Sequence, residues 1–402
     1  MINNKKWTTN SWLEKPAKQL PVYLDHEKNS HVISELSALP SLVEAESIDN
    51  LIALLAKACR GEYFFIQSGD CAERFSDCSN YITQRKMLHI FQMGDILSKN
   101  LNMPIIYIGR LAGQYSKPRS VESETIHEIT LPVYKGDMIN CHEFTAAARR
   151  HDPERMLTAY QCAKIIIDTL KITPIQNRIY TSHEALHLPY EAALTRYNNK
   201  KNKWYNYSTH FPWIGMRTAL YGYAHLEYLR GISNPIGIKI GNVNQLSEIK
   251  KILSLLNPEN VPGRITLIHR FSAHNIQDFL PRLLDEILDS NQKVVWCCDP
   301  MHGNTQLVGD IKTRSMEDII NTLFKAVDLH YKFGTTLAGL HLEATHEDVT
   351  ECITDKTKFQ ESWLQQNYTS LVDPRLNAKQ SFEVVELFSS YYKRFFQKLA
   401  FG

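Results

Sequence analysis

An acid and an imidazole follow an apolar run in the stretch VVWCCDPMHGNT, residues 294–305. The apolar run is typical of a strand that is covered on both faces, and Asp299 and His302 come where that strand would end. Such a pair forms either a polar turn or the rim of a functional site, and the turn is the commoner outcome for a single example. The interpretation therefore depends on how the other strands of the chain end.

The chain alternates strand-like and helical segments over most of its length. Strand-like runs are expected at residues 62–70, 103–110, 178–184, 203–210, 234–241, 264–271, 293–300 and 335–343. Helical stretches such as SEIKKILSLLNP and IQDFLPRLLDEILDS separate most of them, which indicates a parallel sheet. Eight such units favour an α/β fold closed into a (β/α)8 TIM barrel over an open sheet. The first strand is not followed by a GxGxxG motif, and GxxxxGK[ST] does not occur, which argues against a dinucleotide-binding or P-loop domain.

Every predicted strand ends in a charged or metal-binding side chain. In chain order these are Asp70–Cys71, Arg110, His183–Glu184, His210, Lys239, Arg270, Asp299–His302 and His341–Glu343. In a (β/α)8 barrel the C-terminal ends of the strands form the face that contains the active site. Eight such ends in register favour the rim of a site over eight unrelated turns.

The remaining segments predict one domain with helical additions. Residues 1–60 are expected to form a peripheral N-terminal helical extension, because apolar residues recur there at three- and four-residue spacing. Residues 61–402 are expected to form the catalytic barrel, followed by a C-terminal helix in AKQSFEVVELFSSYYKRFFQKLA.

Composition excludes several classes of protein. The net charge of +2 over 402 residues provides no overall field for nucleic acid or an anionic membrane surface, so neither partner is expected. The eight cysteines form neither a disulfide framework nor the paired CxxC spacing of zinc sites. The N-terminus lacks a signal-peptide core, and no stretch approaches 18 apolar residues. These features predict a cytoplasmic protein with reduced thiols.

Four residues form a mixed set of soft and hard metal-binding side chains. They are Cys71, His302, Glu343 and, beyond the last predicted strand, Asp373. A thiolate with an imidazole and carboxylates suits Mn, Fe, Co or Zn, and does not suit Mg or Ca. The alternative is that Cys71 is a small apolar residue of the core, as buried cysteines usually are. Spacing alone leaves both interpretations open.

Cations at or after the strand ends indicate a polyanionic small molecule as ligand. They are Arg110, Lys117, Arg119, Arg217, Lys239 and Arg270. Arginine can hold a carboxylate or phosphate at two points and lysine supplies a point charge, whereas a solvated rim with surface ion pairs is the alternative. Lys239 differs from the others, because a lysine inside an apolar strand is costly unless it is paired or functional.

Several longer motifs of the sequence are specific enough to indicate a known family. IQSGDCAERF, RLAGQYSKPRS, LPVYKGDMIN, TSHEALHLPYEAALTR, STHFPWIGMRT, NPIGIKIG, WCCDPMHGNT, GLHLEATHEDVTEC and DPRLNAKQS occur in this order. Together they resemble the class II (plant-type) 3-deoxy-D-arabino-heptulosonate 7-phosphate (DAHP) synthases over roughly residues 60 to 390. GDMIN and STHFPWIG are most similar to the short branch that serves secondary metabolism such as phenazine biosynthesis.

The resemblance implies a TIM barrel that condenses phosphoenolpyruvate with erythrose 4-phosphate at a divalent metal, with Mn²⁺ or Co²⁺ expected first and Zn²⁺ or Fe²⁺ as alternatives. The family's four metal ligands match Cys71, His302, Glu343 and Asp373. Its phosphoenolpyruvate phosphate site matches Arg217, Lys239 and Arg270, with Arg110 nearby. The family's binding site for the aldose and its phosphate matches Lys117, Arg119 and Ser120. Lys117 also has the reach to donate a proton near the aldehyde, so Lys117, Cys71 and His302 are the expected catalytic residues. Family members assemble into oligomers, so a homodimer or homotetramer is expected.

Several positions depart from the family pattern. Met216 replaces an acid and Ala219 a second arginine, Ser68 replaces a glycine, Ser272 and Asn275 replace a glycine and a lysine, and Val372 replaces a cysteine that could pair with Cys71. Besides an active synthase, two hypotheses remain: a relative that uses a different aldehyde, such as an amino-sugar precursor, and a non-catalytic paralogue. The intact ligand set favours the active synthase.

Overall fold

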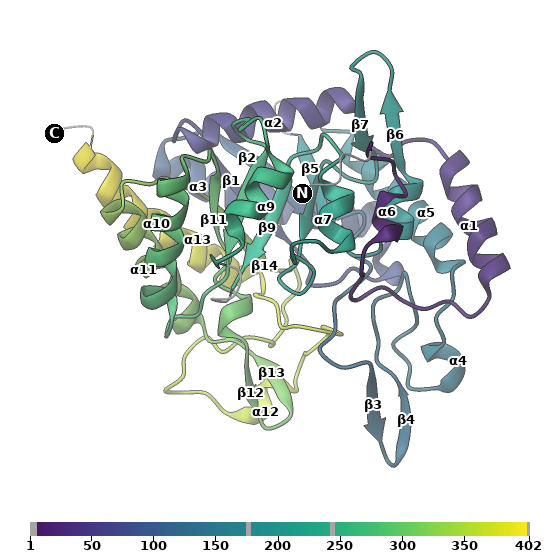
Figure 1. Cartoon of the computed structure of the whole chain (residues 1–402). Helices are drawn as coiled ribbons and strands as arrows, with labels where there is room; N and C mark the ends of the chain where they lie inside the picture. The colour runs from purple at the N-terminus through teal and green to yellow at the C-terminus, as the bar shows by residue number, and fades with distance from the viewer. Residues whose placement is uncertain (1–5, 174–177, 242–245, 400–402) are drawn as a thin grey trace.

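A closed barrel of eight parallel strands forms the centre of the computed structural model, which describes residues 6–173, 178–241 and 246–399 (Figure 1). The strands are β1 (Phe64–Gly69), β2 (Ile105–Arg110), β5 (Ile179–Glu184), β8 (Phe211–Ile214), β9 (Ile236–Ile240), β10 (Ile265–His269), β11 (Val295–Cys298) and β14 (Leu337–Glu343). Each strand pairs in parallel with the next along the chain, and β14 closes the barrel against β1. The predicted (β/α)8 barrel is therefore confirmed.

Helices surround this barrel. They are α1 (His26–Ala38), α2 (Ala45–Cys59), α3 (Asn80–Leu101), α4 (Ala146–Arg149), α5 (Arg155–Leu170), α6 (Leu188–Ala193), α7 (Ala224–Leu229), α9 (Ile249–Leu256), α10 (Ile276–Ser290), α11 (Met316–Lys332), α12 (Glu361–Leu364) and α13 (Ala378–Leu399). The long α3 begins where the Ser79 hydroxyl accepts a hydrogen bond from the N–H of Ile82, and it ends at Asn102 in the left-handed conformation. Ala400, the last residue of the expected C-terminal helix, lies outside the described residues.

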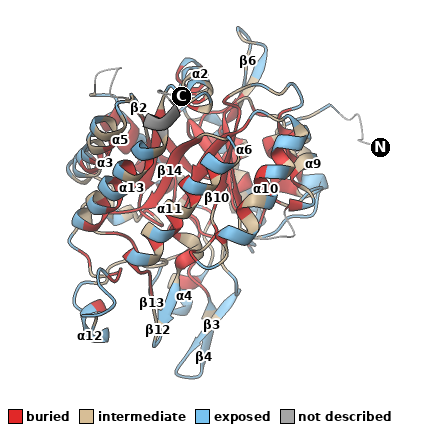
Figure 2. Cartoon of the chain, turned by 90° about the vertical axis from the view of Figure 1, so that its left-hand side faces the viewer, coloured by how far each residue is buried: buried red, intermediate tan, exposed pale blue. Residues whose placement is uncertain are grey.

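Two apolar layers hold the barrel and the helices together. Residues of the strands alternate between them: in β10, Leu267 packs with the surrounding helices, whereas Ile268 packs in the cluster inside the barrel. Figure 2 shows the strands buried and the outer faces of the helices exposed. This alternation follows from the two-residue period of a strand, which turns successive side chains to opposite faces.

Helix α2 covers the N-terminal end of the barrel, across the top of Figure 1. Its Leu51, Leu55 and Ala58 belong to the same apolar cluster as Phe65 and Phe211 of the strands. The N-terminal segment expected to be peripheral thus includes a helix that packs directly against the end of the barrel. The sequence shows only that this helix is amphipathic, and that pattern does not distinguish a surface helix from one that covers the end of a barrel.

Replacing Leu55 with alanine is expected to lower the free energy of unfolding by about 2–5 kcal/mol, because the side chain is fully buried and leaves a cavity. Denaturant unfolding measures the change. Leu24→Ala is the control, since Leu24 is 84% exposed and its removal should change stability by no more than about 0.5 kcal/mol. Equal effects of the two substitutions would contradict the packing of α2 described above.

The fourth strand differs from its prediction. Residues 203–210 do not enter the barrel: β7 (Lys203–Asn206) pairs antiparallel with β6 (Thr195–Asn198), and the barrel strand is β8, four residues long. The aromatic run of β7 resembles a buried strand, whereas Pro212 in β8 lacks the N–H that a central strand normally donates. His210 therefore precedes β8 at the N-terminal end of the barrel, where its Nδ1 accepts a hydrogen bond from the N–H of Thr181. It is absent from the predicted site.

Two further hairpins extend from the barrel at the end opposite α2 (Figure 1). One pairs β3 (Ser123–Ile126) with β4 (Ile129–Pro132), and the other pairs β12 (Gln306–Val308) with β13 (Ile311–Thr313). Both come from loops that follow barrel strands, so they lie beside the C-terminal mouth. There they can add side chains to a site that the strand ends alone would not supply.

Candidate active site

The four candidate metal ligands converge at the mouth of the barrel. Cys71 follows β1 and Glu343 ends β14, and these two strands are paired neighbours. The Sγ of Cys71 lies 3.4 Å from Oδ2 of Asp373, and Nε2 of His302 lies 3.1 Å from Oε1 of Glu343. One ligand atom from each of Cys71, Glu343 and Asp373 lies within 4.8 Å of the other two. The thiol and the two carboxylates thus form one close group, and the imidazole of His302 adjoins it at Glu343. Together they make a donor set that fits a transition metal.

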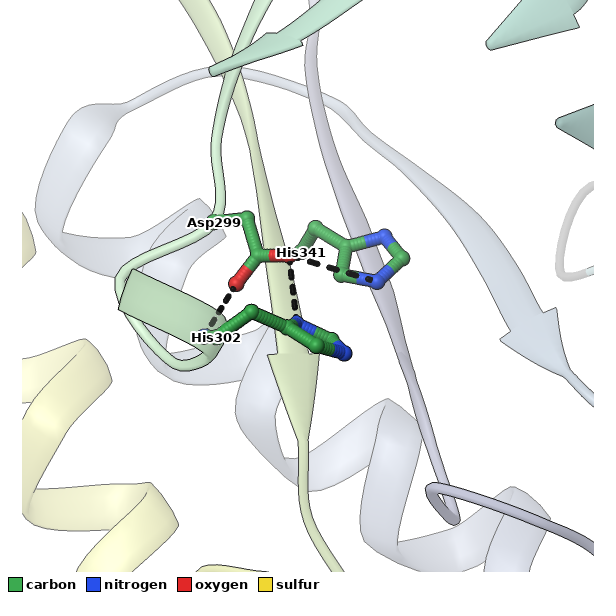
Figure 3. A group of neighbouring side chains, drawn as sticks. All are labelled: Asp299, His302 and His341. Atoms are coloured by element: carbon green, nitrogen blue, oxygen red, sulfur yellow. Dashed lines mark hydrogen bonds and ion pairs between the residues drawn. The ribbon is translucent and has the colours of Figure 1, made fainter. Parts of the chain in front are cut away.

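Asp299 orients the imidazole of His302 (Figure 3). Its Oδ2 lies 2.7 Å from Nδ1 of His302, and its Oδ1 accepts hydrogen bonds from the backbone N–H groups of Met301 and His302. With Nδ1 held by this carboxylate, Nε2 is turned toward Glu343 and is available as a ligand. Asp299 therefore lies behind the candidate metal site, where a carboxylate can fix the tautomer and direction of a histidine ligand.

Asp299, His302 and His341 form a second group close enough to hold a metal ion. The contacts of His341 argue against that role. Its Nδ1 lies 2.7 Å from Oε1 of Gln67, and its Nε2 is hydrogen-bonded to the guanidinium of Arg110. Because both ring nitrogens are engaged, His341 belongs to the network that supports Arg110.

Charges around the ligands are balanced by buried arginines. Arg110 and Arg314 lie 2.8 Å and 2.7 Å from the two carboxylate oxygens of Glu343. Burial by itself would raise the pKa of Glu343, but His302, Arg314 and Arg110 hold that pKa well below its usual value. Burial, reinforced by the negative charge of Glu343, raises the pKa of Cys71 to about 12. A bound cation would therefore displace the thiol proton, as metals do when they bind cysteine.

A cationic cavity of about 220 Å³ is lined by two of the candidate ligands, His302 and Asp373. Its basic lining residues are Arg110, Lys117, Arg217, Lys239, Arg270 and Lys312. The first five were expected from the sequence. Lys312 was not, because it arrives on β13, where its Nζ lies 3.0 Å from Oδ1 of Asp373. So many cations around one small cavity can offset the charge of phosphorylated ligands.

Lys239 is buried at the end of β9. Its Nζ lies 3.2 Å from Oδ2 of Asp299 and 5.6 Å from the ring centre of Trp213. Burial lowers the pKa of Lys239 to about 8, although Asp299 opposes the shift. The lysine that looked costly in an apolar strand is therefore paired, and its ammonium group faces the cavity.

Glu73 holds the loop that presents Lys117. Its carboxylate accepts hydrogen bonds from the backbone N–H groups of Ala112, Gly113 and Gln114, at 2.8–3.0 Å. Lys117 is 6% exposed, and its Nζ lies 3.8 Å from Oε1 of Glu343. Burial would lower the pKa of Lys117, but the surrounding negative groups raise it, so this lysine is a charged donor beside the ligands.

Two residues of the predicted aldose-binding site, Arg119 and Ser120, lie outside the cavity lining. The hydroxyl of Ser120 is on the exposed rim and accepts a 2.8 Å hydrogen bond from Nη2 of Arg217. Arg119 is not among the described residues that line the cavity. Its backbone N–H donates a hydrogen bond to Oε1 of Gln19. The structure thus brings Lys117 to the cavity and leaves Arg119 and Ser120 at its edge.

Of the two residues His183 and Glu184 that end β5, only Glu184 lines the cavity. Nε2 of His183 lies instead 2.8 Å from Oε1 of Glu191. A Cβ on Gly215 would lie 2.0 Å from Oε1 of Glu184, so a side chain at position 215 would displace this carboxylate from its present place. Oε1 of Glu184 has no hydrogen-bond partner among the described residues, although it is buried. Its position at a strand end was the signal in the sequence that identified it.

The positions that depart from the family pattern have local contacts. The sulfur of Met216 lies 3.8 Å from Nη1 of Arg270. Asn275 accepts a 2.8 Å hydrogen bond from the N–H of Ser272, which closes the turn before α10. Ala219 is buried. Each of the eight cysteines, all within the described residues, has a free thiol.

Comparisons with known proteins agree with this geometry. A family model described as the class-II DAHP synthetase family matches residues 7–176 and 171–389. A phospho-2-dehydro-3-deoxyheptonate aldolase of Streptomyces coelicolor is 36% identical over 436 residues, covering 96% of this chain and 97% of the relative. An enzyme of the same name from Neurospora crassa is 36% identical over 461 residues, covering 98% of this chain and 95% of the relative.

A solved structure also has this fold. Phospho-2-dehydro-3-deoxyheptonate aldolase from Francisella tularensis matches with a TM-score of 0.55 at 14% identity, covering 94% of this chain and 99% of that one. Within the described ranges, no helix has the length and apolar character needed to cross a membrane.

Proposed function

This chain belongs to the class-II DAHP synthetase family, and from that premise we propose that the cavity at the barrel mouth is its active site. The enzyme condenses phosphoenolpyruvate with erythrose 4-phosphate to give DAHP and phosphate, the first step of the shikimate pathway. The observation that supports this site most directly is the close group of Cys71, Glu343 and Asp373, with His302 beside Glu343, next to a cavity lined with cations.

The enzyme is metal-dependent, and in this proposal Cys71, His302, Glu343 and Asp373 hold the metal. The mixed donor set favours Mn²⁺ or Co²⁺, with Zn²⁺ or Fe²⁺ as alternatives. When bound, the metal supplies Lewis-acid polarisation of the aldehyde oxygen, which stabilises the negative charge formed as the enol carbon attacks.

Arg217, Lys239 and Arg270 hold the phosphate of phosphoenolpyruvate in this proposal, with Arg110 beside them. All four line one cavity. Arg270 donates through Nη2 to the backbone oxygen of His302, at 3.0 Å, so it is fixed relative to the metal ligand. Two phosphorylated anions must occupy adjacent positions here, and the cations offset their mutual repulsion.

Lys117, Arg119 and Ser120 bind erythrose 4-phosphate. The support for Lys117 is its buried ammonium group, 3.8 Å from Glu343, within reach of a substrate beside the ligands. From there it can donate a proton near the reacting aldehyde. Arg119 and Ser120 lie at the edge of the cavity, where they would meet the terminal phosphate of the four-carbon sugar.

Loss of phosphoenolpyruvate absorbance tests the function. With Mn²⁺ present, consumption is expected only when erythrose 4-phosphate is added, because the aldose is the second substrate. A chelator should abolish consumption and an excess of Mn²⁺ or Co²⁺ should restore it. Turnover with an amino-sugar aldehyde but none with erythrose 4-phosphate would favour the relative with changed specificity, and Met216 and Ala219 would then be the positions to restore. No turnover with any aldehyde and no bound metal would favour the non-catalytic paralogue.

We also propose a homodimer or homotetramer in the cytoplasm. The oligomer follows from the assembly of family members, and light scattering that shows only a monomer would contradict it. The eight free thiols support a reducing compartment. Service to secondary metabolism, such as phenazine biosynthesis, stays a proposal that rests on the motifs GDMIN and STHFPWIG.

A further inference from the structure

Asp373 is the one candidate ligand that lies far from the end of a barrel strand or the turn that follows it. It belongs to a loop between α12 and α13, about 30 residues after β14 ends at Glu343. A ligand on a loop has the correct distance to the others only if the loop is anchored. The contacts of residues 369–376 show how that is done.

Glu351 anchors this loop from inside the protein. Its carboxylate is fully buried, and Oε1 accepts hydrogen bonds from the backbone N–H groups of Thr369 and Ser370, at 3.2 and 2.8 Å. Its Oε2 accepts from the backbone N–H of Arg375, at 2.7 Å. One carboxylate thus fixes the backbone on both sides of Asp373.

Arg375 connects the same loop to the residue before Cys71. Its Nη1 lies 2.6 Å from Oδ1 of Asp70, and its Nε and Nη2 donate to the two carboxylate oxygens of Glu351, at 3.1 and 2.8 Å. Asp70 is also paired with Lys86 of α3, at 2.6 Å. Arg375 is 5% exposed, so these contacts form with little competition from water.

A second tie comes from the backbone. The N–H of Leu376 donates to the carbonyl oxygen of Glu343, at 2.9 Å. The loop is therefore attached to β14 at Glu343 and, through Arg375, to Asp70, which lies between the end of β1 and Cys71. Both attachments come within three residues of Asp373, whose Oδ2 lies 3.4 Å from the sulfur of Cys71.

We propose that Arg375 is a positioning residue for the metal site: with Glu351 and Asp70 it sets the distance between the Asp373 carboxylate and the Cys71 thiolate. This inference rests on the proposed ligand set. Lysine at position 375 would keep one charge, but it cannot donate to Asp70 and to both oxygens of Glu351 together, because it lacks the planar array of donors.

Binding of Co²⁺ to purified wild-type protein and to Arg375→Lys tests the proposal. Wild type should show a near-ultraviolet thiolate-to-cobalt charge-transfer band, and Arg375→Lys should bind Co²⁺ about 10–100-fold more weakly with a reduced band. Arg149→Lys is the matched control. Arg149 is also 5% exposed and holds a loop through Glu124 and the backbone oxygens of His142 and Glu143, away from the ligands. It should leave affinity and band unchanged.

The outcomes separate the two claims. Unchanged affinity and band in Arg375→Lys, or equal weakening in Arg149→Lys, would overturn the positioning role alone. A wild-type protein that binds Co²⁺ without the thiolate band would overturn the proposed ligand set and this inference with it. If Arg375→Lys does not fold, Glu351→Gln replaces it, because an amide cannot accept all the N–H donors that now meet this carboxylate. Glu351→Gln should weaken Co²⁺ binding to a similar extent, and unchanged binding would overturn the proposal.

Discussion

Replacing Cys71 with serine is expected to lower kcat/KM by about 10³-fold or more. A neutral hydroxyl is a poor ligand where a thiolate is required, so the Lewis acid is lost or misplaced. Its contribution is several kcal/mol, and each 1.36 kcal/mol is about tenfold in rate. The substitution itself changes side-chain volume little, so the loss should appear in activity and in bound metal rather than in folding. Phosphoenolpyruvate consumption and metal content measured on the same sample check both.

Cys59→Ser is the matched control for this change. Cys59 ends α2 at the other end of the barrel, and its Sγ donates to the backbone oxygen of Val294. It should retain wild-type activity and metal. Activity of Cys71→Ser within tenfold of wild type, with the metal still bound, would exclude Cys71 as a ligand.

Lys117→Met is the second large effect, with kcat expected to fall by about 10²–10⁴-fold. Methionine preserves most of the length of the side chain and removes the ammonium group. In the proposed role of Lys117, the proton donor near the aldehyde and a cation that attracts the aldose phosphate would both be lost. Steady-state kinetics with erythrose 4-phosphate as the varied substrate measure kcat and KM separately.

Lys135→Met tests whether loss of any buried lysine from this loop region has the same consequence. Lys135 is 4% exposed, and its backbone oxygen accepts a hydrogen bond from the N–H of Lys117. Its Nζ points instead to Glu122, 2.5 Å away. The control should keep near-wild-type kcat. If both variants lose kcat equally, Lys117 has a structural role and not a chemical one.

Strand and helix positions were largely predictable because they depend on local pattern. The span of α10, Ile276–Ser290, was expected to the residue, since its apolar residues recur at the helical period. The exception is β8, Phe211–Ile214. A four-residue strand with an internal proline has too short a pattern to outweigh the aromatic run before it, and its place is decided by pairing with β5 and β9.

The position of the candidate site was also predictable, because parallel strands bring their C-terminal ends to one face. Once Arg110, Lys239 and Glu343 are placed on strands, closure of the barrel brings them together whatever lies between. Lys312 and Arg314 were missed, because they come from a hairpin that follows β11 and nothing in DIKTR distinguishes it from an ordinary polar turn.

The sequence by itself determined the barrel, the end of the barrel where the candidate site lies and the types of side chain at that end. Only the tertiary structure decided that the sulfur of Cys71 meets Asp373, which lies 302 residues away in the sequence. It also decided that Arg375 ties the loop of Asp373 to β1 and that α2 covers the far end of the barrel. The physical reason is that strand and helix periods are local, whereas ligand distances depend on buried hydrogen bonds between segments whose approach no local pattern encodes.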